Sequence, residues 1–142
     1  MDYLSFYHEI LEFHTQGDCD IIDITKGVED VVKRSGMTSG ICTVFCAGST
    51  GSITTIEYES GLLSDFPEAM ERIAPSNAEY KHDLRWRDGN GHSHVRASIV
   101  GPSLTVPFVN RQLTLGTWQQ VVFVDYDNRP RNRTVEVAII GG

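Results

Sequence analysis

Residues 92–140 read HSHVRASIVGPSLTVPFVNRQLTLGTWQQVVFVDYDNRPRNRTVEVAII, and the predicted fold follows from this run. Branched and aromatic residues alternate with polar ones, a pattern typical of half-buried strands. The alternation predicts five strands, over 92–100, 104–108, 112–115, 118–126 and 134–140. Glycine, proline and asparagine turns separate them, and neighbouring strands with such short connections are expected to pair antiparallel.

The preceding residues add four strands and two helices. Strands are predicted over 4–15, 19–22, 41–46 and 52–59, the first two forming a hairpin. Valines that follow Ile24 at helical spacing predict a helix over 25–35 that stops at Gly36. A second stripe, Leu63 to Ile73, predicts a helix that begins near Ser64 or Asp65, with Pro67 in its first turn, and ends before Pro75.

These elements predict an α+β fold in one domain, residues 1–142, with mostly antiparallel sheets in a two-layer, sandwich-like arrangement and two helices. Two short helices cannot cover so many strands. We therefore expect a second sheet or another subunit to bury the remaining sheet face.

Composition limits the partners of this chain. Its formal charge of −7 repels polyanions, which disfavours nucleic-acid or anionic-membrane binding. No apolar run is long enough to span a bilayer, and the start of the chain lacks the pattern of a secretory signal, so a cytoplasmic location is expected. The three cysteines are expected to be reduced, because Cys42 and Cys46 are too far apart along a strand for a disulfide.

Residues 88–99, DGNGHSHVRASI, carry a candidate site. On a strand, His92, His94, Arg96 and Ser98 would share one face. His92 and His94 could then reach one divalent metal, with His82 as a third ligand and one position left open, an arrangement typical of catalytic zinc. Two alternatives remain: the histidines contact substrate or phosphate directly, or they have no functional role.

Polar residues near the histidines extend this candidate site. Asp83, Asp88 and Asn90 could orient an imidazole or ligate magnesium, or Asp88 and Asn90 could simply shape a turn. Arg96 is a candidate anion ligand, or else forms a salt bridge with a nearby carboxylate.

Three further segments offer binding or catalytic groups. The loop containing Ser49 and Thr50 has the hydroxyls and amides of a phosphate-binding nest, although tight strand connections look similar. Glu57 and Glu59 would share a strand face, and either is a candidate general base or second metal ligand, or else an exposed edge residue. Trp118 offers a stacking surface or belongs to a core or interface.

Three arginines near the C-terminus are expected to be neutralised by Asp125 and Asp127; they are Arg129, Arg131 and Arg133.

Several motifs together resemble one known family. They are Tyr80-Lys81-His82, Asp88-Gly89-Asn90, His94, Ala97-Ser98, Gly101-Pro102-Ser103, Val106-Pro107, Gly116-Thr117-Trp118-Gln119 and the strand Val121 to Asp127. The chain resembles the YjbQ family, also called UPF0047 or the secondary thiamine-phosphate synthase family.

The resemblance implies a compact trimeric α+β fold and a polar pocket that holds a metal or an anion. It also implies weak thiamine-phosphate synthase activity, in which a hydroxymethylpyrimidine diphosphate joins a thiazole phosphate with loss of pyrophosphate. The implied site residues are His82, Asp88, Asn90, His94, Ser98, Thr117, Trp118 and Gln119.

Two positions depart from the commonest pattern of that family. Gly48 stands where many members carry the histidine of Pro-His-Thr-Thr, and His92 stands where many carry an acidic residue. One histidine lost and one gained in the same presumed pocket resembles a rearranged ligand set.

Three functions are compatible with these residues. The first is an enzyme acting on a phosphorylated heterocycle, in which His82, His94, Asp88 and Glu57 catalyse, and a divalent metal, zinc rather than magnesium, neutralises phosphate together with Arg96. The second is a zinc-dependent hydrolase whose metal is held by His82, His92 and His94. The third is a non-catalytic homotrimer that binds a metal or a small phosphorylated metabolite.

Overall fold

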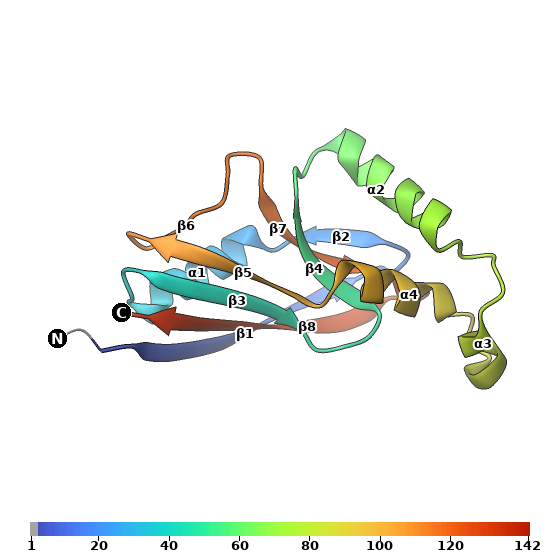
Figure 1. The fold of residues 1–142 in the computed structure, drawn as a ribbon, viewed down its shortest axis with the longest axis horizontal. Helices are drawn as coiled ribbons and strands as arrows, with labels where there is room; N and C mark the ends of the chain where they lie inside the picture. Colours follow the sequence, from blue (N-terminus) through green and yellow to red (C-terminus); the bar gives the residue numbers. More distant parts are fainter. Residues whose placement is uncertain (1–2) are drawn as a thin grey trace.

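A computed structural model describes residues 3–142, so Met1 and Asp2, at the start of the predicted domain, lie outside the described residues. Two antiparallel sheets form its framework (Figure 1). The larger sheet has the strand order β1 (Ser5–Thr15), β8 (Arg131–Gly141), β3 (Gly40–Cys46), β5 (Ser103–Val109), β6 (Gln112–Leu113). The smaller sheet has the order β2 (Asp20–Asp23), β7 (Gln120–Asp125), β4 (Gly51–Ile56). The expected α+β fold with mostly antiparallel sheets is confirmed.

Three predicted pairings between observed strands were wrong. β1 and β2 form no hairpin, because the chain changes sheets between them. Gly17, Asp18 and Cys19 all have positive φ, and a Cβ on Gly17 would approach two backbone carbonyl oxygens within 2.7 Å. This left-handed turn carries the chain into the smaller sheet. β6 and β7 lie in different sheets, and so do β7 and β8. β8 pairs instead with β1 along its whole length.

The main core lies between the two sheets and α1 (Thr25–Ser35). Val28, Val31 and Val32 of α1 are fully buried, as the helical spacing predicted. They pack in one cluster with Val137 of β8 and Phe123 of β7. Each such side chain contributes about 1.5–3 kcal/mol by leaving water. This core fixes the position of β7, whose two ends support different parts of the candidate site.

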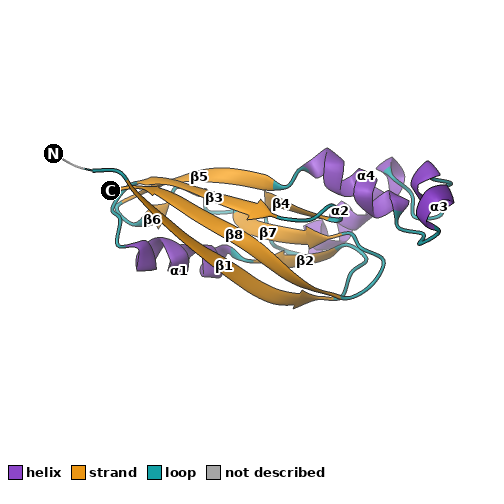
Figure 2. Ribbon diagram, turned by 90° about the horizontal axis from the view of Figure 1, so that it is seen from below, coloured by secondary structure: helices purple, strands orange, loops and turns teal. Residues whose placement is uncertain are grey.

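A second core covers the other face of the smaller sheet. Val122 and Val124 of β7 and Tyr126 pack there against Met70 of α2 (Ser60–Ile73) and Ala97 of α4 (Gly91–Val100). The smaller sheet thus lies between the larger sheet and these helices. Figures 1 and 2 show α2, α4 and the short α3 (Lys81–Trp86) gathered at the end of the molecule opposite the N- and C-termini.

Helix α2 begins earlier than the sequence predicted. Its first residue is Ser60, and the Glu59 carboxylate caps it by accepting the backbone N–H groups of Gly61 and Leu62. Pro67 therefore lies inside the helix rather than in its first turn. A carboxylate at this position also interacts favourably with the positive end of the helix dipole.

The outer face of the larger sheet carries exposed apolar side chains. They are Phe6, Ile10, Ile41, Phe45, Val109 and Ile140, each at least 42% exposed. β1 is also an edge strand. Within residues 3–142 no helix is both long enough and apolar enough to cross a bilayer. All three cysteines are free and buried, as expected.

Candidate functional site

Residues 91–100 form helix α4, so the predicted strand over 92–100 was wrong. The buried residues of α4 are Gly91, His92, Ser93, Arg96 and Ala97, which is the spacing of a helix face. Alternation at every second residue favoured a strand, but here polar side chains lie on both sides of the helix. The alternation of polar and apolar side chains therefore did not correspond to an alternation of exposed and buried positions.

The change from strand to helix divides the predicted site. Residues four apart share a helix face, so His92 lies with Arg96, and His94 lies with Ser98. His92 and His94, two apart, project to opposite sides of α4. The expected shared face of His92, His94, Arg96 and Ser98 does not exist, and neither does the proposed ligand set of His82, His92 and His94.

On one side of α4, His94 meets His82 of α3. The centroids of the two imidazoles lie 4.3 Å apart and the rings are tilted by 37°. Burial, followed by the charge of His82, lowers the pKa of His94. A neutral imidazole at His94 near neutral pH can accept a proton.

Two carboxylates lie beside His82. Its Nδ1 is 3.4 Å from Oδ1 of Asp83 and 3.6 Å from Oδ1 of Asp88. Each carboxylate is held by the backbone at the start of α4: Asp83 accepts the Gly91 N–H at 2.8 Å, and Asp88 accepts the Asn90 N–H at 3.2 Å. The side chains are therefore positioned before any ligand arrives.

Within residues 3–142, His82, Asp83 and Asp88 form the one group of three His, Cys, Asp or Glu residues whose ligand atoms all lie within 4.8 Å of one another. One imidazole and two carboxylates suit zinc, which accepts nitrogen and oxygen ligands. Magnesium prefers oxygen ligands and retains several waters, so it fits this group less well. Asp83 was proposed from the sequence only as an imidazole partner or magnesium ligand, and its position next to His82 was the signal for its inclusion.

A small cavity of about 260 Å³ lies next to His94. Ser98 and the loop before β4, including Gly48 and Ser49, line it. A Cβ on Gly48 would meet Nη1 of Arg133 at 3.6 Å, an ordinary contact. Gly48 and His94 are thus close together, whereas His92 faces elsewhere. The expectation that the lost and gained histidines share one pocket was wrong.

Thr50 turns away from this cavity into a buried polar network. Its hydroxyl donates to Asp127 at 3.0 Å and accepts from Arg133 at 2.8 Å. Arg133 binds both oxygens of Asp125 at 2.7 Å, and Arg131 lies 3.1 Å from Asp127. These acids neutralise Arg131 and Arg133, as the sequence led us to expect, whereas Arg129 pairs with neither acid. The hydrogen bonds of Thr50 therefore hold the loop before β4 in place.

Asn90 also has a supporting position. It is 5% exposed, and its Oδ1 accepts the Ser93 hydroxyl at 2.5 Å and the Asn128 N–H at 3.2 Å. The first bond lies within the start of α4, and the second ties that start to the segment after β7. Asn90 thereby helps to fix the start of α4, the helix that carries His94.

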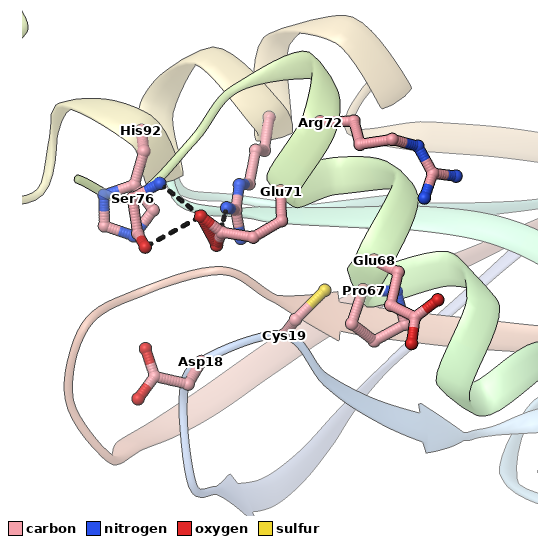
Figure 3. Close-up of a pocket in the computed structure, with 9 residues that line it drawn as sticks. Asp18, Cys19, Pro67, Glu68, Glu71, Arg72, Ser76 and His92 are labelled. Atoms are coloured by element: carbon pink, nitrogen blue, oxygen red, sulfur yellow. Dashed lines mark hydrogen bonds and ion pairs between the residues drawn. The ribbon is translucent and has the colours of Figure 1, made fainter. Parts of the chain in front are cut away.

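On the other side of α4, Arg96 forms a salt bridge. Its Nε donates to the Ala74 carbonyl at 3.0 Å and its Nη2 to Glu71 at 2.8 Å. Figure 3 shows Glu71 on α2, between His92 and Arg72. Of the two expected roles, the salt bridge is the one observed. Arg96 links α4 to the end of α2 and does not face the His94 cavity.

The remaining predicted residues lie at the far end of the smaller sheet. β4 and β7 pair antiparallel from Gly51 opposite Asp125 to Ile56 opposite Gln120, a span of about 17 Å. Glu57 follows β4 at that far end, and the loop between β6 and β7 precedes β7 there and projects from the molecule (Figure 1). Within one chain, the residues of this end do not meet the His82 group; they are Glu57, Thr117, Trp118 and Gln119.

The loop residues also differ in how firmly they are held. Gln119 bonds to the Gly116 N–H at 2.9 Å and to Thr55 at 3.3 Å, which stiffens the loop. Trp118 is 71% exposed and packs on no core of this chain. A large ring held out by a stiff loop is available to a partner or a ligand.

Comparison with known proteins agrees with this fold. A family model described as UPF0047 protein YjbQ-like matches residues 9–142. A UPF0047 protein of Methanothermobacter thermautotrophicus is 40% identical over 98% of this chain and 95% of its own length. UPF0047 protein YugU of Bacillus subtilis is 33% identical over 92% of this chain and 97% of its own length.

Solved structures show the same likeness. A YbjQ-like protein of unknown function from Sulfolobus solfataricus superposes with a TM-score of 0.94 and 31% identity, covering 99% of this chain and all of that one. An uncharacterised YjbQ/UPF0047 protein from Clostridium acetobutylicum gives a TM-score of 0.85 and 33% identity over 92% of this chain and 98% of its own. The chain therefore belongs to the YjbQ-like UPF0047 family.

Proposed function

We propose that the protein binds one divalent metal, zinc in preference to magnesium, through His82, Asp83 and Asp88, and acts with it on a small phosphorylated substrate. The observation that carries the proposal is the convergence of three ligand atoms within 4.8 Å. The ligands come from α3 and the loop that follows it, and the backbone around α4 fixes both carboxylates. Such a set leaves coordination positions free for water or substrate.

His94 is the group proposed to transfer protons. It stands beside His82, lines the 260 Å³ cavity, and has a lowered pKa that favours the neutral form. A bound zinc would supply a Lewis acid for a phosphoryl oxygen or for a water molecule. Ser49 and Ser98, which line the same cavity, offer hydroxyls to the substrate.

The proposed substrate class is a phosphorylated heterocycle. Its support is the resemblance to the secondary thiamine-phosphate synthase family, together with the hydroxyls around a cavity of limited size. The proposed reaction joins a pyrimidine diphosphate to a thiazole phosphate and releases pyrophosphate. Arg96 has no part in this proposal, because Glu71 and Ala74 engage it on the far side of α4.

Zinc-dependent hydrolysis is a second candidate. It is favoured by the combination of one imidazole and two carboxylates with a neutral imidazole beside them, a set that activates water. In that reaction Asp88 or His94 would accept the proton of the water. The two candidates share one metal site and differ in their acceptor, a thiazole in the first and water in the second.

We further propose that the protein is a homotrimer. Its support is the exposed apolar outer face of the larger sheet, which includes Phe6, Ile41 and Ile140. Burial of such a patch by another copy is favourable by roughly 25 cal/mol per Å². Sedimentation equilibrium at micromolar concentration tests this proposal, and Phe6→Asp should shift the protein towards monomer.

Metal analysis tests the main proposal. Protein purified without chelator should carry about one zinc per chain, and His82→Ala and Asp88→Asn should remove it. His14→Ala, which alters an exposed histidine of β1, should retain zinc. Zinc retained by both site variants would contradict the proposal. Pyrophosphate release is then measured with both phosphorylated heterocycles and with each one alone, in wild type and in His94→Ala. Release that requires both substrates indicates synthesis, and release from one substrate alone indicates hydrolysis.

A further inference from the structure

One ion pair lies within the exposed apolar face of the larger sheet. Nε2 of His8, on β1, is 2.5 Å from Oε2 of Glu136, on the neighbouring strand β8. The two side chains are 40% and 37% exposed. Both lie on the outer face, because successive residues of a strand alternate between the outer face and the core. In a single chain the pair is therefore in contact with solvent.

Apolar side chains surround this ion pair. Glu136 is paired across the sheet with Ile10 of β1 on one side and with Phe45 of β3 on the other. The ring of Phe6 stacks beside the imidazole of His8, with centroids 6.4 Å apart and an interplanar angle of 7°. Ile10, Phe45 and Phe6 are each at least 42% exposed. A partner that covers these apolar side chains therefore also covers His8 and Glu136.

Few other ionisable groups lie near the pair. Glu12 and His14 follow farther along the outer face of β1, and His14 bonds to Asn132 at 2.9 Å. Glu9 belongs to the opposite face, where Arg34 binds both of its carboxylate oxygens at 2.8 Å. The outer positions of β3 and the remaining outer positions of β8 carry no ionisable side chain. Within residues 3–142, His8 is the one ion-pair partner of Glu136.

Protonation of His8 changes the net charge of this face. An ordinary imidazole takes up its proton at about pH 6.5, and the pair is then neutral as a whole. Without that proton, Glu136 adds an unpaired negative charge to the apolar face of a chain with a formal charge of −7. An unpaired charge is more costly to bury than an ion pair in contact. Because copies of this chain repel one another, a face without net charge is the most favourable place for them to meet.

We infer that proton uptake at His8 strengthens the contact between copies of this chain. This inference rests on the homotrimer proposed above, in which the outer face of the larger sheet is the contact surface. Copies that meet through this face bury the ion pair with His8 protonated. As the pH rises from about 6 to about 8, each buried Glu136 carboxylate loses its cation, and the trimer dissociates more readily.

Sedimentation of a dilution series of the full chain at about pH 6 and about pH 8 tests the inference. The concentration at which half of the protein is trimeric should rise at least about tenfold between these two pH values. His8→Gln should lose most of this rise. Glu136→Gln should reverse it, because protonated His8 is then the unpaired charge in the contact. Both substitutions are on the surface, and circular dichroism should show an unchanged fold.

The matched control is His14→Gln, which alters an exposed histidine on the same face of the same strand. It should keep the pH dependence of the wild type, because His14 bonds to an amide and not to a carboxylate. A trimer equally strong at both pH values, or a Glu136→Gln variant with the pH dependence of the wild type, overturns the inference and leaves the homotrimer standing. Protein that is monomeric at both pH values contradicts the homotrimer itself, and the inference with it.

Discussion

The two sides of helix α4 use similar residues for different purposes. On one side, His94 and Ser98 border a small cavity next to His82 and its two carboxylates. On the other, His92 and Arg96 are almost fully buried, and Arg96 fastens the helix to α2. A histidine and its neighbour four residues later thus border the proposed catalytic cavity on one side and belong to the buried contact between α4 and α2 on the other.

The two sides of α4 differ in how deeply their side chains are buried. Arg96 is 4% exposed, so its loss would leave the carbonyl of buried Ala74 and the half-exposed carboxylate of Glu71 without this donor. The ligand atoms around His82 are held by backbone N–H groups but keep lone pairs free. One side of α4 should therefore govern metal affinity, and the other should govern stability.

The largest expected effect concerns zinc on the His94 side. His82→Ala should weaken zinc binding at least about 100-fold, because one of three converging ligands is lost. The free energy of unfolding of the metal-free protein should change by less than about 0.5–1 kcal/mol. Competition with a zinc indicator measures the affinity. A comparable loss in His92→Phe would break the proposed division between the two sides.

The next largest effect is on stability and comes from the contact of Arg96 with Glu71 and Ala74. Arg96→Met should lower the free energy of unfolding by about 2–3 kcal/mol, since it leaves the Ala74 carbonyl and one oxygen of Glu71 without this donor. Glu71 is half exposed, which limits the loss. Urea denaturation measures it, with Arg72→Met, a nearby exposed arginine, expected to change stability by less than about 0.5 kcal/mol.

A pair of serines makes a finer comparison. Ser93 is fully buried and its hydroxyl bonds to Asn90 and to Tyr126, so Ser93→Ala should cost about 1–2 kcal/mol. The Ser98 hydroxyl donates to the His94 carbonyl within the helix, and Ser98→Ala should cost at most about 0.5 kcal/mol. Equal costs for the two variants would show that burial does not distinguish the two sides.

The smallest effect depends on pH. Hydrogen bonds from the Ser76 backbone and from Arg96 lower the pKa of Glu71 to about 2. The stability that this carboxylate contributes is present above its unfolded pKa of about 4.5 and is lost as the pH falls towards 2. Because the group is half exposed, we expect less than about 1 kcal/mol. Wild type and Glu71→Gln should therefore differ most above pH 4.5 and converge near pH 2, as urea titrations would show.

Much of the fold was predictable because most strands and α1 have one-sided apolar patterns. Val28, Val31 and Val32 marked a buried helix face. Ile41 to Cys46 marked a central strand, β3, which pairs with β8 and β5, although its Ile41 and Phe45 face outward and are exposed. The pairing of β1 with β8 joins the two ends of the chain, which local patterns cannot reveal. α3 was missed because its six residues are mainly polar and none is buried.

The candidate site was predicted less well for a related physical reason. Residues 92–99 satisfy a period of two in side-chain type, whereas burial follows a helical period. The sequence brought His82, Asp83, Asp88 and His94 under consideration together, and the structure places them side by side. It could not reveal that Arg96 is occupied by Glu71, because that partner is 25 residues away on another helix.

Zinc-edge anomalous diffraction from crystals of chelator-free protein is the most direct measurement of the division proposed for α4. We predict one anomalous peak beside His82, Asp83 and Asp88, and none beside His92. A peak coordinated by His92, or zinc-replete crystals with no peak at His82, would contradict the account.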